Sequence, residues 1–97
     1  MPRDDGFTYP GQYQQSIVSR RVSFTNGDTE LDLGVPCSTI SIAVESGADL
    51  HVAWDNTTAL TTDAKITGGS SFTYQGPPLQ KIRHIGSASG ALNVVAF

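Results

Sequence analysis

The sequence predicts an all-β domain: an antiparallel β-sandwich or jelly-roll-like barrel of about seven to eight short strands, preceded by an extended N-terminal arm. Apolar residues recur at every second position over much of the chain, and residues typical of turns separate these runs. No stretch shows the 3.6-residue periodicity of an amphipathic helix.

The arm is expected to span residues 1–15, where aliphatic side chains are almost absent and proline, glycine, glutamine and aromatic residues prevail. Aromatic side chains offer a large contact area at low entropic cost when an extended segment docks on a neighbour. The residues expected to bind a partner are Phe7, Tyr9, Pro10 and Tyr13. The alternative is a chain end whose aromatic residues have no partner.

The β-sandwich domain is expected to span residues 16–97, and four strands are predicted in its first half. Asn26-Gly27 follows the first of them and is expected to supply the positive φ of a tight turn. Gly34 and Pro36 are expected to interrupt the ladder after the second strand. The four strands are 16–24, 29–33, 38–46 and 49–55.

The second half begins with a polar, threonine-rich connection over residues 55–71, which contains one short strand around 64–67. Pro77-Pro78 is expected to stop the strand that follows, and the segment 86–90 forms the last turn. The remaining predicted strands are 71–76, 79–85 and 91–97.

Composition and charge exclude several classes of partner. The net charge is −3 and the six basic residues are scattered, whereas nucleic-acid binding needs them clustered. No apolar run approaches the roughly 20 residues that cross a bilayer, so no membrane contact is expected. The N-terminus lacks the apolar region of a secretory signal, so we expect synthesis in the cytosol or an already removed signal.

Few residues could carry catalysis, and we expect no enzyme activity and no cofactor. Cys37 with His84 is the one nucleophile and base pair that the sequence leaves open. However, Cys37 lies beside Pro36 just before the clearest strand, which favours a small buried hydrophobe. His51 lies at one of the alternate positions of its strand that are expected to face solvent, which indicates a surface or interface position.

A run of oxygen-bearing side chains superficially resembles the start of a calcium loop. Such a loop needs glycine at its sixth position and a bidentate glutamate at its twelfth, but those places are Leu31 and Cys37. We therefore interpret the run as the solvated face of a strand and expect no metal. The run consists of Asn26, Asp28, Glu30 and Asp32.

Trp54 has the same parity as Leu50 and Val52, so burial in the core is expected. An exposed platform that stacks on sugars is the alternative reading of this side chain. Together with the Asn-, Asp- and Thr-rich stretch 55–63, that reading supports a carbohydrate-binding β-sandwich module as an alternative function.

Two stretches, AVESGADLHVAWDNTTA and KITGGSSFTYQGPPLQKIRHIGSASGALNVVAF, follow a strand and turn rhythm with a Gly-Gly-Ser turn, a Lys-Ile strand and a Ser-Gly-bounded last strand. Over residues 38–97 this rhythm resembles the small β-sandwich virion structural proteins of tailed bacteriophages. The arm of residues 1–15 has no counterpart in the pattern.

The resemblance implies a non-enzymatic capsid decoration or cement protein that stabilises the assembled shell by binding across capsid subunits. A tail, fibre or adaptor module is the alternative within the virion. The implied partners are the major capsid protein or other virion proteins, together with further copies of this chain in a homo-oligomer, for which we expect a trimer. The implied location is the capsid surface of the virion, after synthesis in the host cytoplasm.

Overall fold

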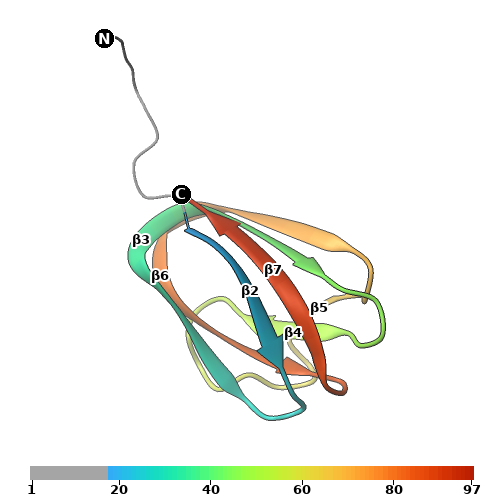
Figure 1. Ribbon diagram of the computed structural model, residues 1–97. Coiled ribbons are helices and arrows are strands. Elements are labelled where there is room, and N and C mark those ends of the chain that lie inside the picture. The colour runs from blue at the N-terminus through green and yellow to red at the C-terminus, as the bar shows by residue number, and fades with distance from the viewer. Residues whose placement is uncertain (1–17) are drawn as a thin grey trace, which may run out of the picture.

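A computed structural model describes residues 18–97, and all regular structure in this range is β-strand (Figure 1). Two of the strands are 16 residues long, whereas the others have between three and seven residues. The strands are β2 (Val18–Phe24), β3 (Thr29–Val44), β4 (Leu50–Ala53), β5 (Ala64–Ile66), β6 (Ser71–Gly86) and β7 (Gly90–Ala96).

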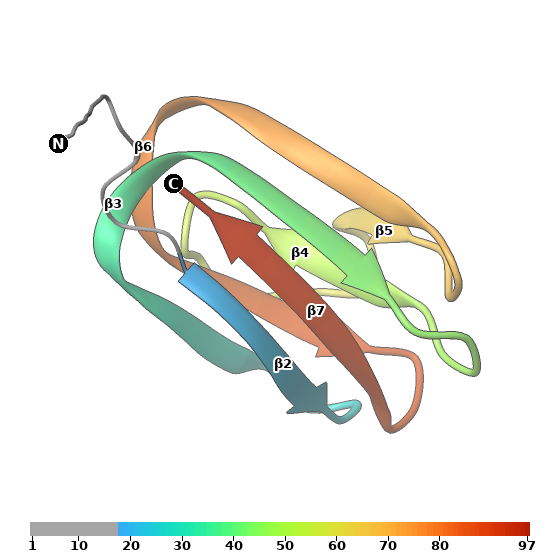
Figure 2. The same cartoon turned by 45° about the horizontal axis from the view of Figure 1, so that its top comes forward.

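The strands form one antiparallel sheet in the order β2-β7-β3-β6-β4-β5, and this sheet is not closed. The first part of β3 pairs with the last part of β6, and the last part of β3 pairs with the first part of β6. Between these two stretches both strands bend side by side (Figure 2). The bend divides the sheet into two halves that face each other.

We call these the β2 half and the β4 half. The β2 half comprises β2 and β7 with the last part of β3 and the first part of β6. The β4 half comprises β4 and β5 with the first part of β3 and the last part of β6. Phe24 on β2 meets His84 of the β4 half edge to face, with ring centroids 6.4 Å apart. The core therefore lies between the two halves of a single sheet.

The described residues contain six strands, fewer than the seven to eight predicted, because two predicted pairs are each one continuous strand. Gly34 and Pro36 shift the register between Asp32 and Cys37 but do not end β3. Pro77-Pro78 likewise lies inside β6. These residues bend the strands without ending them. A β-bulge leaves a residue unpaired, so it can accommodate a proline, which has no N–H to donate, and it increases the local twist.

The predicted alternation of apolar residues is confirmed along the strands. Buried residues alternate with more exposed ones in the last part of β6 and over most of β4 and β7. They also alternate in β3, where the buried parity changes across the register shifts, and no residue in the first part of β6 is buried. The predicted short strand around 64–67 is present as β5. Fully buried side chains in the core include Ile40, Ile42, Leu50, Val52, Ile82, Leu92 and Val94.

The prediction of positive φ at Asn26-Gly27 is wrong. Within residues 18–97 the left-handed residues are at other positions. The connection between β2 and β3 instead uses Thr25 Oγ1, which accepts a hydrogen bond from the Gly27 N–H at 3.1 Å, and Thr29 Oγ1, which donates to the Gly27 carbonyl at 3.2 Å. Hydroxyl groups that bond to nearby backbone can hold a turn without left-handed residues.

The bulge in β3 depends on Gly34, which has φ +86° and donates its N–H to Asp32 Oδ1 at 2.8 Å. A Cβ at Gly34 meets no atom within 4 Å, so a substitution there acts through backbone strain alone. We expect Gly34→Ala to lower the free energy of unfolding by about 1–2 kcal/mol, measured by urea denaturation.

Gly27→Ala is the matched control, because Gly27 is not left-handed and its Cβ would make an ordinary contact of 3.5 Å with Thr25 Oγ1. Equal stability of the two variants would contradict a role for the left-handed residue in the bend.

Candidate functional site

Three aromatic side chains gather at the open side of the sheet, and we call them the aromatic cluster. Trp54 follows β4, while Phe72 and Tyr74 lie on the first part of β6. The Trp54 and Tyr74 rings are stacked, with centroids 5.2 Å apart and an interplanar angle of 17°. The Trp54 and Phe72 centroids are 5.7 Å apart, and these rings are tilted by 45°. The cluster therefore joins the β4 half to the β2 half.

The aromatic cluster faces inward but is incompletely covered. Phe72 pairs with Ile42 and Tyr74 pairs with Ile40, so all four side chains lie on the core face of the sheet. Phe72 is nevertheless 49% exposed, whereas Ile42 is 1% exposed. The difference arises because the first part of β6 is the margin of the β2 half. An apolar surface thus reaches solvent at the margin of the sheet, beside the first part of β6.

Hydrogen bonds around the last part of β3 show which way the backbone groups of β6 point. Thr39 exchanges both of its backbone hydrogen bonds with Phe97, so its N–H and C=O face away from β6. Val44 donates its N–H to the Ser70 carbonyl and therefore faces β6. Because these directions alternate along a strand, Ile40 and Ile42 also face β6, and their partners Tyr74 and Phe72 face β3.

It follows that the intervening residues of β6 direct their N–H and C=O groups away from β3. Among residues 18–97 no strand pairs with them on that side, because β4 pairs only with Arg83, His84, Ile85 and Gly86 of β6. We call this row the β6 edge. It consists of Ser71, Thr73 and Gln75.

The β6 edge carries no charge, whereas the other exposed edges in the described part of the chain do. Residues 71–79 contain no Asp, Glu, Lys or Arg. β2 carries Arg20 and Arg21, the first part of β3 carries Glu30, and β5 carries Lys65. Charged side chains on an edge strand prevent unwanted strand pairing. The β6 edge lacks this protection and is the best candidate for an interaction site.

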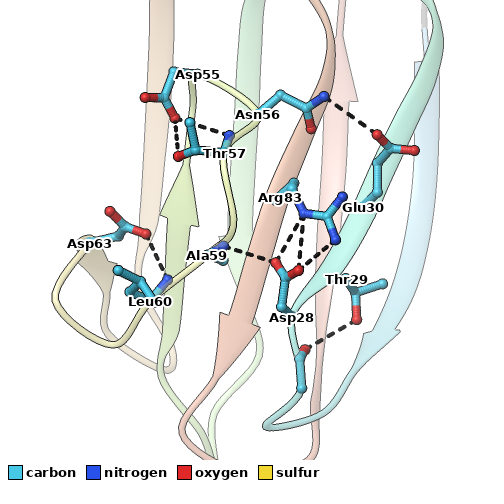
Figure 3. A network of polar contacts seen from close by, with 11 residues as sticks. Asp28, Thr29, Glu30, Asp55, Asn56, Thr57, Ala59, Leu60, Asp63 and Arg83 are labelled. Carbon is cyan, nitrogen blue, oxygen red and sulfur yellow. Dashed lines mark hydrogen bonds and ion pairs between the residues drawn. The ribbon is translucent and has the colours of Figure 1, made fainter.

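A polar network fixes the loop that follows Trp54 (Figure 3). The Arg83 Nε donates to both carboxylate oxygens of Asp28 at 3.1 Å, and the Ala59 N–H donates to Asp28 Oδ1 at 2.9 Å. The Arg83 guanidinium, followed by the Ala59 N–H, holds the pKa of the Asp28 carboxyl below its usual value. Asn56, which is left-handed with φ +60°, donates to Glu30 Oε2 at 3.4 Å. Arg83 of β6, Glu30 of β3 and Asp28, which precedes β3, thereby hold the loop that follows Trp54.

Trp54 was expected in the core, and the structure places it at the margin of the core, partly buried and packed against buried residues. Neither the predicted position in the core nor the alternative of an exposed platform describes this position fully. The parity of Phe72 and Tyr74 was visible in the sequence. Their contact with Trp54 was not, because it depends on which strands pair.

Cys37 is confirmed as a small buried hydrophobe. It is 1% exposed, and burial raises the pKa of its thiol. His51 is half-buried, and its Nδ1 lies 3.1 Å from the Asp63 carbonyl oxygen.

His84 is 1% exposed, and neither ring nitrogen has a hydrogen-bond partner among the described residues. Sequence reasoning missed this burial, although His84 has the same parity as the buried Ile82. Burial lowers the pKa of His84 below the usual value of an imidazole, against the opposing effect of the nearby Asp28 carboxylate.

The carboxylates of the acidic run have separate partners. Asp28 binds Arg83, Glu30 accepts from Asn56, and Asp32 accepts from the Gly34 N–H. Within residues 18–97 no three His, Cys, Asp or Glu side chains are grouped so that they could hold a metal ion. In the same range no pocket is found, and no helix is long and apolar enough to cross a membrane.

The four residues predicted to bind a partner lie outside the described residues, as does the whole segment 1–15. They are Phe7, Tyr9, Pro10 and Tyr13. The binding role of this segment stays a prediction.

No family model matches the chain, and no curated protein or solved structure is detectably similar to it.

The polar network predicts that Asp28 stabilises the loop 55–63. Asp28→Asn keeps the size of the side chain but weakens its bonds to the Arg83 guanidinium and the Ala59 N–H. We expect faster proteolytic cleavage within the loop under native conditions. Glu45→Gln is the control, since it weakens the Arg21–Glu45 ion pair away from this loop. Equal cleavage of both variants in the loop would argue against the network.

The burial of His84 is expected to make the fold sensitive to acid. Its pKa is lowered in the folded chain, so the unfolded chain binds more protons as the pH falls below 6.5. The contribution of the neutral His84 to the free energy of unfolding is therefore fully present above pH 6.5. It is lost as the pH falls toward the pKa of His84 in the folded chain, by at most about 1.4 kcal/mol per pH unit for one proton. We expect His84→Leu to abolish this loss as the pH falls below 6.5, measured by urea denaturation at successive pH values. His51→Gln, the control, should retain it.

Proposed function

We propose that this chain is a non-enzymatic structural module that assembles with other proteins, with the folded-over sheet acting as a two-layer β-sandwich. The observation that carries the proposal is the uncharged β6 edge with the partly exposed aromatic cluster beside it. Unpaired backbone groups supply affinity for an extended strand, and neighbouring side chains supply selectivity. Such a surface serves protein association without any chemical step.

The more specific form of the proposal is a capsid decoration or cement protein on the surface of a tailed-phage virion, made in the host cytoplasm. This form is supported by the resemblance in strand and turn rhythm over residues 38–97. The chain would bind across subunits of the major capsid protein and stabilise the shell by mass action, because it binds only the assembled state. A homo-oligomer would add avidity through several arms. A tail, fibre or adaptor module is the alternative location.

Binding to shells tests the role of the arm. We expect a chain in which Phe7, Tyr9 and Tyr13 are replaced by Ser to bind empty shells at least about tenfold more weakly, because aromatic anchors commonly cost 2 kcal/mol or more when truncated. Co-sedimentation with empty shells assembled from a major capsid protein measures the effect. The control replaces Gln12, Gln14 and Gln15 by Ser in the same segment. Unchanged binding by the aromatic variant would overturn the role of the arm.

A carbohydrate-binding module is the second candidate. It is favoured by the near-parallel Trp54 and Tyr74 rings at the surface, because sugars stack on aromatic faces. Trp54 is the only tryptophan in the chain, so its fluorescence reports on this site directly. A glycan array and titration of Trp54 fluorescence with the sugars it identifies distinguish this function from protein assembly.

A further inference from the structure

The β6 edge is self-complementary, and this property identifies a partner for it. Its three outward residues are evenly spaced, with Thr73 midway between Ser71 and Gln75. We propose that the β6 edge pairs antiparallel with the β6 edge of a second copy, about a two-fold axis at Thr73, and so forms a continuous sheet through two chains. The inference rests on the proposed assembly function and names the partner of this edge.

The pairing satisfies the outward backbone groups on both chains. With the axis at Thr73, each Thr73 faces the second copy's Thr73, and each Ser71 faces the second copy's Gln75. Every residue that directs its N–H and C=O outward thus meets another such residue. Because each non-proline residue has one donor and one acceptor, the interface contains about six backbone hydrogen bonds. Outward groups that would otherwise lack strand partners are paired in one symmetric step.

The same register covers the exposed part of the aromatic cluster. Phe72 faces the second copy's Tyr74 on the core face of the joined sheet, and the symmetric pair forms beside it. Directly opposed residues of an antiparallel pair have Cβ atoms about 4.5–5.5 Å apart, and aromatic pairs in this position are favourable. The exposed side of Phe72 is thereby packed against a second aromatic cluster, which joins the cores of the two chains.

Charge and sequence favour a second copy over an extended pairing with many chains. The uncharged segment 71–79 can approach itself without repulsion. Gly76 and Pro77-Pro78 end the regular edge, so pairing stops after about five residues on each chain. An interface that uses the same surface on both chains closes as a dimer and does not propagate. This interface joins two copies, whereas a trimer needs a different one.

Proline at position 73 tests the hydrogen bonds. The Thr73 N–H points outward, so Thr73→Pro removes it without removing a bond to β3. We expect sedimentation equilibrium to show a reversible dimer for the full chain. We expect the dissociation constant of the Thr73→Pro dimer to be about thirtyfold higher than that of the wild type, since the symmetric interface loses two hydrogen bonds. Thr73→Val, the control, keeps the N–H and loses only the exposed hydroxyl contact to Ser41 Oγ.

Opposite charges at position 73 test the axis itself and do not require the proline variant to fold. Thr73 is exposed on the outer face, so Thr73→Lys and Thr73→Glu should fold. Each variant alone should dimerise more weakly than wild type, because like charges lie directly opposite each other. An equimolar mixture should restore the dimer. Failure of the mixture to exceed either variant alone would overturn the proposed register.

Two further outcomes would overturn the inference. One is a full chain that stays monomeric at its highest soluble concentration. The other is a dimer that is lost on deletion of residues 2–15 but kept in Thr73→Pro, which would make the N-terminal segment the occupant of the interface. Binding to shells is measured separately with the arm variants, so failure of the edge interface and failure of the proposed function are distinguishable.

Discussion

The bend shared by β3 and β6 is the constraint on which the rest of the structure depends. A flat six-stranded sheet of this length would leave one apolar face in water, and the described residues contain no helix to cover it. Because both long strands bend at the same level, the sheet covers its own apolar face. Left-handed Gly34 and the register shift between Asp32 and Cys37 accommodate the bend on β3. Gly76 and Pro77-Pro78 on β6 lie at the second register shift, between Cys37 and Thr39.

The bend also determines where the sheet stays open. β6 has partners on both sides in the β4 half, where β3 and β4 flank it. In the β2 half it has β3 on one side only, since β4 does not extend past the bend. The aromatic cluster fills the gap between the halves at this margin, with Trp54 from one half and Phe72 and Tyr74 from the other. The candidate interaction surface is therefore a geometric consequence of folding one sheet over itself.

Much of the fold could be predicted from local patterns in the sequence. The parity of Ile40, Ile42 and Val44 identified the buried face of β3, and the short strand around Ala64 was recognised within a polar stretch. The continuity of β3 and β6 was not predicted, because Gly34 with Pro36 and the Pro77-Pro78 pair have the composition of turns. Whether such residues end a strand or bend it depends on strand pairing across the sheet, which no local pattern reveals.

The candidate site was less accessible to sequence reasoning for the same reason. Trp54 and Tyr74 are distant in the chain, and their stacking depends on the register of β4 and β6. The burial of His84, in contrast, follows from its parity with Ile82 and could have been predicted. Sequence reasoning considered His84 only as a possible base beside Cys37, although alternation with apolar neighbours on one strand face indicates burial whatever the residue type is.

The edges of the sheet differ in their charge. Edge strands tolerate lysine, arginine and glutamate at little energetic cost, because their outward side chains lie in water. The chain has such residues on β2, the first part of β3 and β5, but none between Ser71 and Leu79. Phe72 is also half-exposed there, which adds an apolar surface to unpaired backbone groups. An edge that combines both features is a ready template for another strand. A symmetric, uncharged edge fits the same edge of a second chain, which is why we propose that chain as its partner.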